Sequence, residues 1–104
     1  MILDERTYTL VPSRKASFLQ QYEERGLMLQ VRHLQHLVGY FETEIGTVNQ
    51  IVHIWAYEDL RDRADRRAAL QRDLDWQAFV KDTISCIDRM ENRILVPTRF
   101  SPMQ

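Results

Sequence analysis

The sequence predicts an α+β fold, a four-stranded antiparallel sheet with its helices on one face. Two observations lead to this fold class. Apolar runs typical of strands and of helices follow one another along the 104 residues in the order strand, helix, strand, strand, helix, strand. In addition, residues 49–57 form a predicted strand that is apolar on both faces. A chain of this length makes a single domain, 1–104, so a second copy is expected to cover the outer face of that strand.

The chain is predicted to begin with a strand followed by a long helix. The strand, residues 2–11, ends at Pro12, which has no N–H to donate to a sheet. Ser13 is the predicted N-cap of a helix in which apolar residues recur at helical spacing as far as His33. Gly26 destabilises this helix by about 1 kcal/mol relative to alanine, so we expect a bend or break there.

The next two strands are predicted to form a hairpin. Residues 37–45 and 49–57 are rich in β-branched and aromatic side chains, and Gly46 opens the connection between them. Because side chains alternate along a strand, the second of these strands carries two sets of residues. One face has Ile51, His53, Trp55 and Tyr57, and the other has Val52, Ile54 and Ala56.

The last predicted elements are two helical segments and a strand. Asp59 is predicted to cap a helix with a narrow apolar stripe that faces the sheet. This stripe consists of Leu60, Ala64 and Ala68. A further amphipathic segment is predicted to start at Asp75, with an apolar face of Trp76, Phe79, Val80, Ile84 and Ile87. Residues 89–98 give a fourth strand, which completes the ferredoxin-like βαββαβ order with both helices on one sheet face.

The composition excludes several classes of partner. Fourteen basic and fifteen acidic residues alternate along the chain and leave a formal net charge of -1, which does not suit nucleic-acid binding. No segment is long and apolar enough for a signal peptide or a membrane span, so neither a membrane partner nor export is predicted. Cys86 is the only cysteine and cannot form an intrachain disulfide, and it is expected to pack as a small apolar side chain. We therefore expect a cytoplasmic protein.

His53 is the candidate catalytic residue, because an imidazole can act as acid, base or ligand near neutral pH. Three nearby residues are candidate ligand-binding groups. Asn49 and Trp55 are predicted on the same strand face as His53, and Tyr40 on the neighbouring strand. Each also has a structural interpretation. His53 can be bonded to a neighbouring strand, Asn49 can shape the hairpin, and aromatic strand residues commonly pack in cores or interfaces.

Two arginines of the second predicted helix are further candidate ligand-binding residues. Helical spacing places Arg67 beside the apolar stripe, with Arg63 one turn away. An inward arginine can hold a carboxylate through two hydrogen bonds. Alternatively, Arg67 pairs with Asp62 or with an acid on the sheet. The remaining arginines of this helix are expected on a solvated, salt-bridged face; they are Arg61, Arg66 and Arg72.

No metal site and no cofactor are predicted. His33 and His36 lie three residues apart on a predicted helix, but no third ligand is near them in the sequence. Cys86 has no neighbouring base that would activate it as a nucleophile.

Several blocks of the sequence resemble the NIPSNAP family. The longest is residues 49–57, which continues through Leu60, Arg63 and 66–70 to 75–79. The flanking blocks are 6–8, 37–41, 90–95 and 100–102. They occur in the order and spacing of the family and cover nearly the whole chain. The chain is similar to a small, single-domain bacterial-type member, without the targeting sequence and second domain of the animal members.

The resemblance implies a dimeric α+β barrel, and therefore a homodimer or a higher homo-oligomer. Its wider superfamily includes small oxygenases, isomerases and haem-processing enzymes that hold ligands between the sheet and the helices. Fold analogy does not transfer a reaction, so whether the chain is an enzyme stays open. We expect it to bind a small anionic or aromatic molecule with His53 and Arg67 as polar contacts, with oxygenase- or isomerase-type chemistry. The alternative is a non-catalytic interaction or assembly module.

Overall fold

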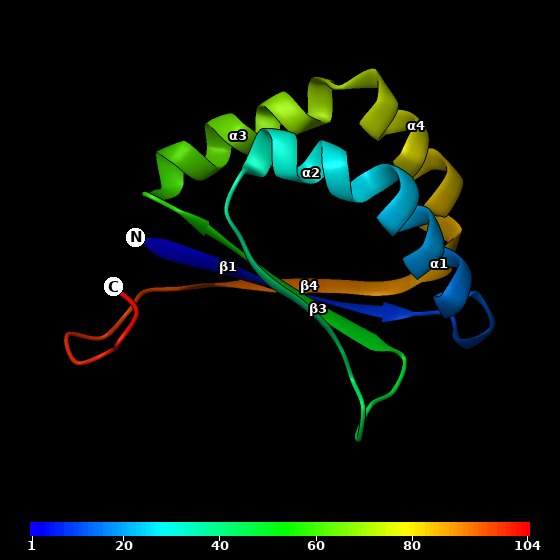
Figure 1. Ribbon diagram of the computed structural model, residues 1–104, viewed down its shortest axis with the longest axis horizontal. Coiled ribbons are helices and arrows are strands. Elements are labelled where there is room, and N and C mark those ends of the chain that lie inside the picture. Colours follow the sequence, from blue (N-terminus) through cyan, green and yellow to red (C-terminus); the bar gives the residue numbers. More distant parts are fainter.

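The computed structural model describes residues 1–104 and contains the predicted four-stranded antiparallel sheet. Its strands are β1 (Ile2–Leu10), β2 (Leu37–Glu42), β3 (Gln50–Tyr57) and β4 (Ile87–Leu95). They lie side by side in the order β2-β3-β1-β4, and each neighbouring pair is antiparallel. All helices lie on one side of the sheet (Figure 1). The α+β, ferredoxin-like fold class is confirmed.

A long helical arm connects β1 to β2. It consists of a short turn (Pro12–Arg14), α1 (Lys15–Gln21), a π-helical turn (Tyr22–Gly26) and α2 (Leu27–Leu34). The predicted cap at Ser13 is wrong, because Ser13 lies inside the short turn and no side chain caps α1. The helix does not break at Gly26, but the regular α-helical pattern is interrupted there by the π-helical turn that ends at Gly26. A Cβ at Gly26 would lie 2.8 Å from Cζ of Phe79, so glycine allows the aromatic ring to pack directly against the helix.

Two further helices connect β3 to β4. These are α3 (Leu60–Arg72) and α4 (Leu74–Thr83), followed by a short turn (Ile84–Cys86). The side chain of Asp59 caps α3, as predicted, by accepting a hydrogen bond of 2.7 Å from the backbone N–H of Asp62. Asp73, not Asp75, caps α4, since its carboxylate accepts from the backbone N–H groups of Asp75 and Trp76. The chain therefore turns between the two helices at Asp73.

The predicted inward stripe of α3 is wrong. Leu60 is 61% exposed, and Ala64 and Ala68 are exposed as well. The side of α3 that faces the sheet carries Arg63, Arg67 and the buried Leu70. This rotation has a physical reason. Helix α3 lies over the start of β1 and the end of β3 (Figure 1), and there Arg63 pairs with the buried carboxylate of Asp4.

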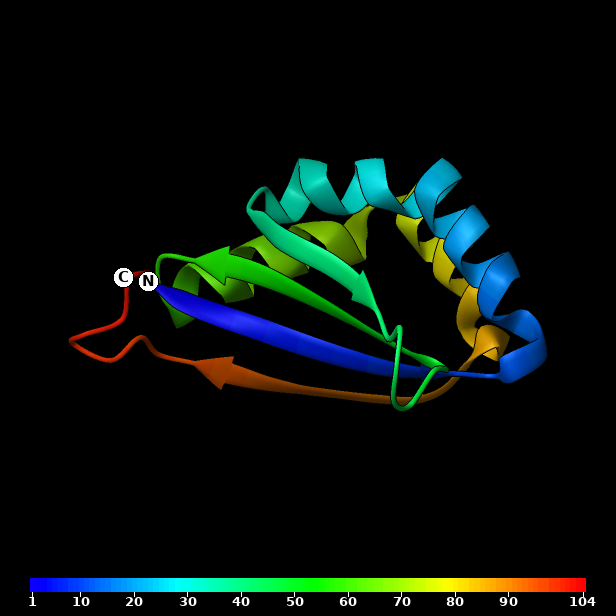
Figure 2. The same ribbon diagram turned by 60° about the horizontal axis from the view of Figure 1, so that its bottom comes forward.

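The core lies between the helices and the inner face of the sheet (Figure 2). Its largest fully buried side chains include Trp55, Tyr57 and Leu10 from the strands and Leu34 and Leu70 from the helices. The other buried apolar residues are Tyr8, Phe18, Tyr22, Leu29, Ile51, Trp76, Phe79 and Cys86. Cys86 thus packs as a small apolar side chain, as predicted.

The outer sheet face and β4 are less covered. Val52, Ile54 and Ala56 are half-buried on the outer side of β3, and β4 is exposed along most of its length. Several strand boundaries also differ from the prediction. β1 ends one residue earlier than expected, at Leu10, and β4 runs from Ile87 to Leu95 instead of 89–98. β2 ends at Glu42, and β3 begins at Gln50, so Asn49 lies in the connecting turn. No helix has the length and apolar character needed to span a membrane.

Candidate functional site

His53 lies in the middle of β3, with its side chain on the inner face and no exposed surface. Its Nδ1 accepts a hydrogen bond of 2.8 Å from the indole Nε1–H of Trp55, two residues along the same strand. An indole nitrogen can only donate, so Nδ1 carries no proton and the hydrogen of the neutral imidazole is on Nε2. This Nε2–H group is buried and has no hydrogen-bond partner.

Burial keeps the imidazole of His53 neutral. It lowers the pKa of His53 from 6.5 to about 3, and the positive charges of Arg6 and Arg67 act in the same direction against the nearby charge of Asp4. A histidine in this state is a poor general base at neutral pH. It is instead a fixed hydrogen-bond donor toward any oxygen that reaches Nε2.

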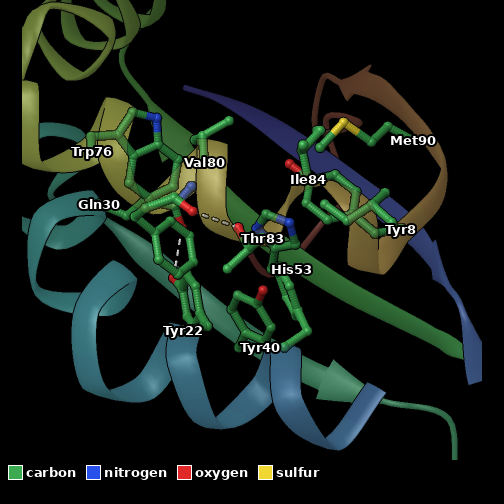
Figure 3. A pocket seen from close by; sticks show the side chains of 13 residues that line it. Tyr8, Tyr22, Gln30, Tyr40, His53, Trp76, Val80, Thr83, Ile84 and Met90 are labelled. Atoms are coloured by element: carbon green, nitrogen blue, oxygen red, sulfur yellow. Dashed lines mark hydrogen bonds between the residues drawn. The ribbon is translucent and has the colours of Figure 1, made fainter. Parts of the chain in front are cut away.

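A cavity of about 40 Å³ lies beside His53, between the inner face of the sheet and the helices (Figure 3). Tyr40 of β2 stacks on the imidazole with a centroid distance of 4.6 Å, and Tyr8 of β1 meets it edge-on at 4.7 Å. Tyr22 closes another wall and donates a hydrogen bond of 2.6 Å to Gln30. Burial raises the pKa values of Tyr22 and Tyr40, so both hydroxyls stay protonated.

The cavity borders two side chains that reach solvent. Ile84 lies in the turn before β4 and is 50% exposed, and Met90 of β4 is 48% exposed. An apolar cavity of about 150 Å³ holds benzene, so the cavity as observed is smaller than an aromatic ligand requires. Unbranched methionine is among the most adaptable of side chains, and displacement of Met90 and Ile84 would enlarge the space without breaking a hydrogen bond.

A second group of polar side chains lies under α3. The carboxylate of Asp4, which has no exposed surface, accepts hydrogen bonds from Nε of Arg63 at 2.9 Å, Nη1 of Arg6 at 3.2 Å and Nδ2 of Asn92 at 3.0 Å. Burial alone would raise the pKa of Asp4, but the hydrogen bonds from Asn92 and Arg63 and the charge of Arg6 hold it below its usual value. Arg67 lies one turn from Arg63 and forms no ion pair.

The structure thus separates the predicted site residues into two groups. His53, Trp55 and Tyr40 are in contact around the imidazole. Arg63 and Arg67 belong to the group around Asp4, although the charge of Arg67 is felt at His53. Asn49 joins neither group, and its backbone carbonyl accepts a hydrogen bond of 2.8 Å from the N–H of Leu10.

Sequence reasoning missed Asp4 and Arg6, and it missed their role as the polar floor under α3. A signal was present, because Asp4, Arg6, Tyr8 and Leu10 alternate along the first strand and therefore share one face. The two helix histidines also take different places. His33 bonds through Nε2 to Asp73 at 2.8 Å, whereas His36 is exposed beyond the end of α2. No three His, Cys, Asp or Glu side chains gather closely enough to hold a metal ion.

Comparison with known proteins places the chain among relatives of the same architecture. The family model described as NIPSNAP matches residues 3–102. This chain belongs to the NIPSNAP family. The human protein NipSnap homolog 3A is 38% identical over 96 residues, and the NipSnap protein of Drosophila melanogaster is 32% identical over 103 residues. These matches cover 88% and 99% of this chain but only 38% and 37% of the relatives, so the NIPSNAP chain spans less than two fifths of their length.

Solved structures of bacterial NIPSNAP proteins are similar over most of their length. A NIPSNAP family protein of Agrobacterium tumefaciens is 42% identical with a TM-score of 0.95, and the match covers 99% of this chain and 98% of that one. A NIPSNAP-like domain protein of Burkholderia xenovorans is 47% identical with a TM-score of 0.91, covering 97% and 88%. A putative antibiotic biosynthesis monooxygenase of Nitrosomonas europaea shares the fold at 10% identity, with a TM-score of 0.69 over 93% and 98% of the two chains.

Proposed function

We propose that this NIPSNAP protein binds a small, largely apolar molecule between its sheet and its helices, with Nε2–H of His53 donating a hydrogen bond to an oxygen of that molecule. The observation that carries the proposal is the buried Nε2–H group without a partner beside an apolar cavity. Buried polar groups are nearly always hydrogen-bonded, and one left unpaired is destabilising by about 1–3 kcal/mol. A ligand oxygen removes that penalty.

The surroundings of His53 favour a carbonyl or ether oxygen on an aromatic or aliphatic body. Ten of the 13 residues that line the cavity are hydrophobic, and Tyr40 and Tyr8 offer aromatic surfaces on two sides of the imidazole. The hydrogen bond from Trp55 fixes the imidazole as a donor, so an oxygen that only accepts fits better than a hydroxyl or an amine.

The binding test compares two ligands of nearly the same shape, acetophenone and α-methylstyrene. Only the ketone has an oxygen that accepts from His53, so we expect it to bind about three- to tenfold more tightly. His53→Phe removes the donor and is expected to abolish this preference, as measured by calorimetry. The control is His33→Phe, which changes a histidine of α2 that contacts Asp73 outside the cavity.

A measurement on the unmodified protein guards against variants that do not fold. Nitrogen-15 NMR is expected to show a protonated Nε2 and an unprotonated Nδ1 in His53, and saturating acetophenone is expected to shift the Nε2–H proton. If neither ligand binds, or if the ketone leaves that proton signal unchanged, the proposed function is wrong.

The chemistry that such a donor favours is of the isomerase or oxygenase type, in which negative charge develops on a substrate oxygen. A neutral, preorganised donor in a dry site stabilises that charge. The fold shared with a putative monooxygenase is compatible with this extension. Its test is solvent deuterium exchange at the methyl group of acetophenone. A solvent hydroxide takes the methyl proton, Nε2–H of His53 stabilises the enolate oxygen and solvent returns a deuteron, so we expect exchange to be faster with the wild type than with His53→Phe.

We further propose that the protein is a homodimer, because the outer face of β3 offers a surface that a second copy fits. Val52, Ile54 and Ala56 are only half-buried there, and Phe41 of the neighbouring β2 is 54% exposed. Light scattering is expected to give a dimer that Ile54→Arg dissociates, whereas Ile45→Arg in the hairpin loop leaves it intact. A monomer at micromolar concentration would contradict this. A dimer without any ligand binding would favour the interaction or assembly module.

The compartment proposed for the protein is the reducing cytoplasm. Its single cysteine, Cys86, is buried as a free thiol and takes no part in a crosslink.

A further inference from the structure

The group of polar side chains under α3 carries more positive charge than Asp4 neutralises. Asp4 pairs with Arg6 of β1 and with Arg63 of α3, whereas the half-buried Arg67, one helical turn from Arg63, has no acidic partner. Three guanidinium groups and one carboxylate leave a charge of +2. Arg63 and Arg67 are four residues apart and so lie on the same side of the helix.

Both oxygens of the Asp4 carboxylate already accept hydrogen bonds. Oδ2 of Asp4 accepts from Arg6 and from Arg63, and Oδ1 accepts from Asn92. Arg63 donates only through Nε, and both of its Nη groups are left without an acceptor in the chain. Arg67 is half-buried and donates to nothing. A guanidinium has five N–H donors and no acceptor, so the arginines cannot satisfy one another.

The hydroxyl of Tyr57 adds a buried donor at the same place. Tyr57 is 2% exposed, and its hydroxyl has no hydrogen-bond partner. Trp55 is directly opposite Asp4 in the register, so Tyr57 is the diagonal neighbour of Asp4 on the inner sheet face, roughly 7–8 Å away between Cα atoms. Burial raises the pKa of Tyr57, so the hydroxyl keeps the hydrogen that it can donate.

We propose that Arg67, Arg63 and the hydroxyl of Tyr57 form a binding site for a dianionic phosphate group under α3. A phosphate dianion matches the excess charge of +2 and brings several acceptor oxygens to a place where the protein supplies only donors. The guanidinium groups bind its oxygens through charge-assisted hydrogen bonds, and Tyr57 donates a further one.

This phosphate site is distinct from the cavity at His53. None of the three residues lines that cavity, and Tyr8, whose hydroxyl accepts from Nε of Arg6 at 3.1 Å, stands between the two places. The phosphate site therefore does not depend on the proposed binding of an apolar ligand, and either proposal can fail alone.

The test is calorimetric titration of the full chain with inorganic phosphate, at constant ionic strength and at a pH where phosphate is a dianion. Arg67→Ala is expected to weaken binding at least about tenfold, and Tyr57→Phe about threefold. Arg61→Ala is the matched control. Arg61 is on the same helix and carries the same charge, but it is 85% exposed and pairs with Asp65, so its removal is expected to change affinity less than twofold.

Two further ligands define the chemical class. Phenyl phosphate is expected to bind more tightly than benzoate, which carries a single charge on a similar body. Failure of the wild type to bind phosphate, or equal loss in Arg67→Ala and Arg61→Ala, would overturn the site. Benzoate binding as tightly as phenyl phosphate would overturn its assignment to phosphate. Acetophenone affinity is expected to be the same in Arg67→Ala and wild type. The test of the phosphate site is therefore independent of the test of ligand binding at His53.

Discussion

The layer between the sheet and the helices buries polar side chains at both of its ends, but in opposite ways. Under α3, the charge of Asp4 is buried together with arginines that donate to it. Around His53, the polar group is buried among aromatic rings, stays neutral and keeps one donor unpaired. The first arrangement holds charge by pairing, and the second avoids charge altogether. Unused binding capacity at the first end is therefore ionic, whereas at the second it consists of neutral donors, Nε2–H of His53 and the buried indole N–H of Trp76.

The largest expected effect comes from removing the acid at the ionic end. Asp4→Asn takes away the negative charge that neutralises Arg6 and Arg63, so the buried cations lose their counter-charge. Breaking a buried pair in this way typically destabilises a protein by about 3–5 kcal/mol. We expect a loss of this size in the free energy of unfolding, measured by urea denaturation.

A neighbouring acid provides the control for Asp4. Glu5 also pairs with an arginine, Arg93, at 2.8 Å, but on the outer sheet face, where Arg93 is 69% exposed. Glu5→Gln is expected to change stability by less than about 1 kcal/mol. Similar losses of unfolding free energy in Asp4→Asn and Glu5→Gln would mean that the ion pairs of Asp4 are solvated, like the exposed pair of Glu5 and Arg93.

The next largest effect is a loss of stability at low pH, and it comes from the neutral, buried His53. The pKa of His53 is about 3 in the folded protein against 6.5 when unperturbed, so between these values the unfolded chain binds a proton that the folded chain does not. Stability therefore falls as the pH drops below 6.5 and is fully present above it. Lowering the pH from 7.5 to 5 is expected to remove about 2 kcal/mol.

The variant His53→Gln isolates this contribution. Its side-chain carbonyl can accept from Trp55, but it does not titrate, so its stability is expected to lose about 2 kcal/mol less than the wild type over the same range. Asp4 does not interfere, since its lowered pKa contributes stability that is lost only below its ordinary value of 3.8. If the stability of the two proteins depended on pH in the same way, His53 would titrate normally and its surroundings would be solvated.

A smaller effect tests how tightly the aromatic end is packed. A Cβ at Gly26 would lie 2.8 Å from both Phe79 and Tyr22. Overpacking of this kind is destabilising by about 1–3 kcal/mol, while alanine in a helix contributes up to about 1 kcal/mol relative to glycine. Gly26→Ala is therefore expected to lose about 1 kcal/mol in thermal or urea unfolding, and Phe79→Leu in the same chain is expected to relieve part of the strain. A more stable Gly26→Ala protein would mean that the rings have room to move.

The sequence predicted the aromatic surroundings of His53 better than the ion pairs under α3. The order of elements, the buried face of β3 and the aromatic packing of Trp76 and Phe79 followed from apolar periodicity, which depends on neighbours in the chain. The ionic end did not follow, because pairing of Asp4 with Arg63 joins residues 59 positions apart. The apolar stripe that was expected to face the sheet is exposed, whereas the inward position expected for Arg67 agrees with its half-burial, and Arg63 is turned inward with it.

The pairing of His53 shows the same limit within the candidate site. Its place on the inner face follows from alternation, but its tautomer depends on the direction of the Trp55 indole, a side-chain choice that alternation does not determine. Asn49 was expected on the strand, with the hairpin connection as the alternative; β3 begins one residue later, at Gln50, so Asn49 lies in the connecting turn.

The smallest effect concerns Tyr8, which connects the two ends. Its hydroxyl accepts from Arg6 at 3.1 Å, and its ring meets His53 edge-on. Tyr8→Phe keeps the ring and removes the acceptor, so we expect a loss of about 0.5 kcal/mol, the lower end of the net range for one hydrogen bond. Arg6 retains its bond to Asp4, which limits the loss. Equilibrium urea unfolding of the variant and the wild type measures it.

Double-mutant cycles then show to which end the Tyr8 hydroxyl belongs. Tyr8 and Asp4 share Arg6 as a partner, so Tyr8→Phe and Asp4→Asn are expected to be coupled by at least about 0.5 kcal/mol. Gly26 does not contact that hydroxyl, and its change to alanine is expected to add to Tyr8→Phe within about 0.5 kcal/mol. Strong coupling between Gly26→Ala and Tyr8→Phe would mean that the ion pairs and the aromatic core form one cooperative unit. A change in the packing of the aromatic rings would then alter the contact between Tyr8 and Arg6.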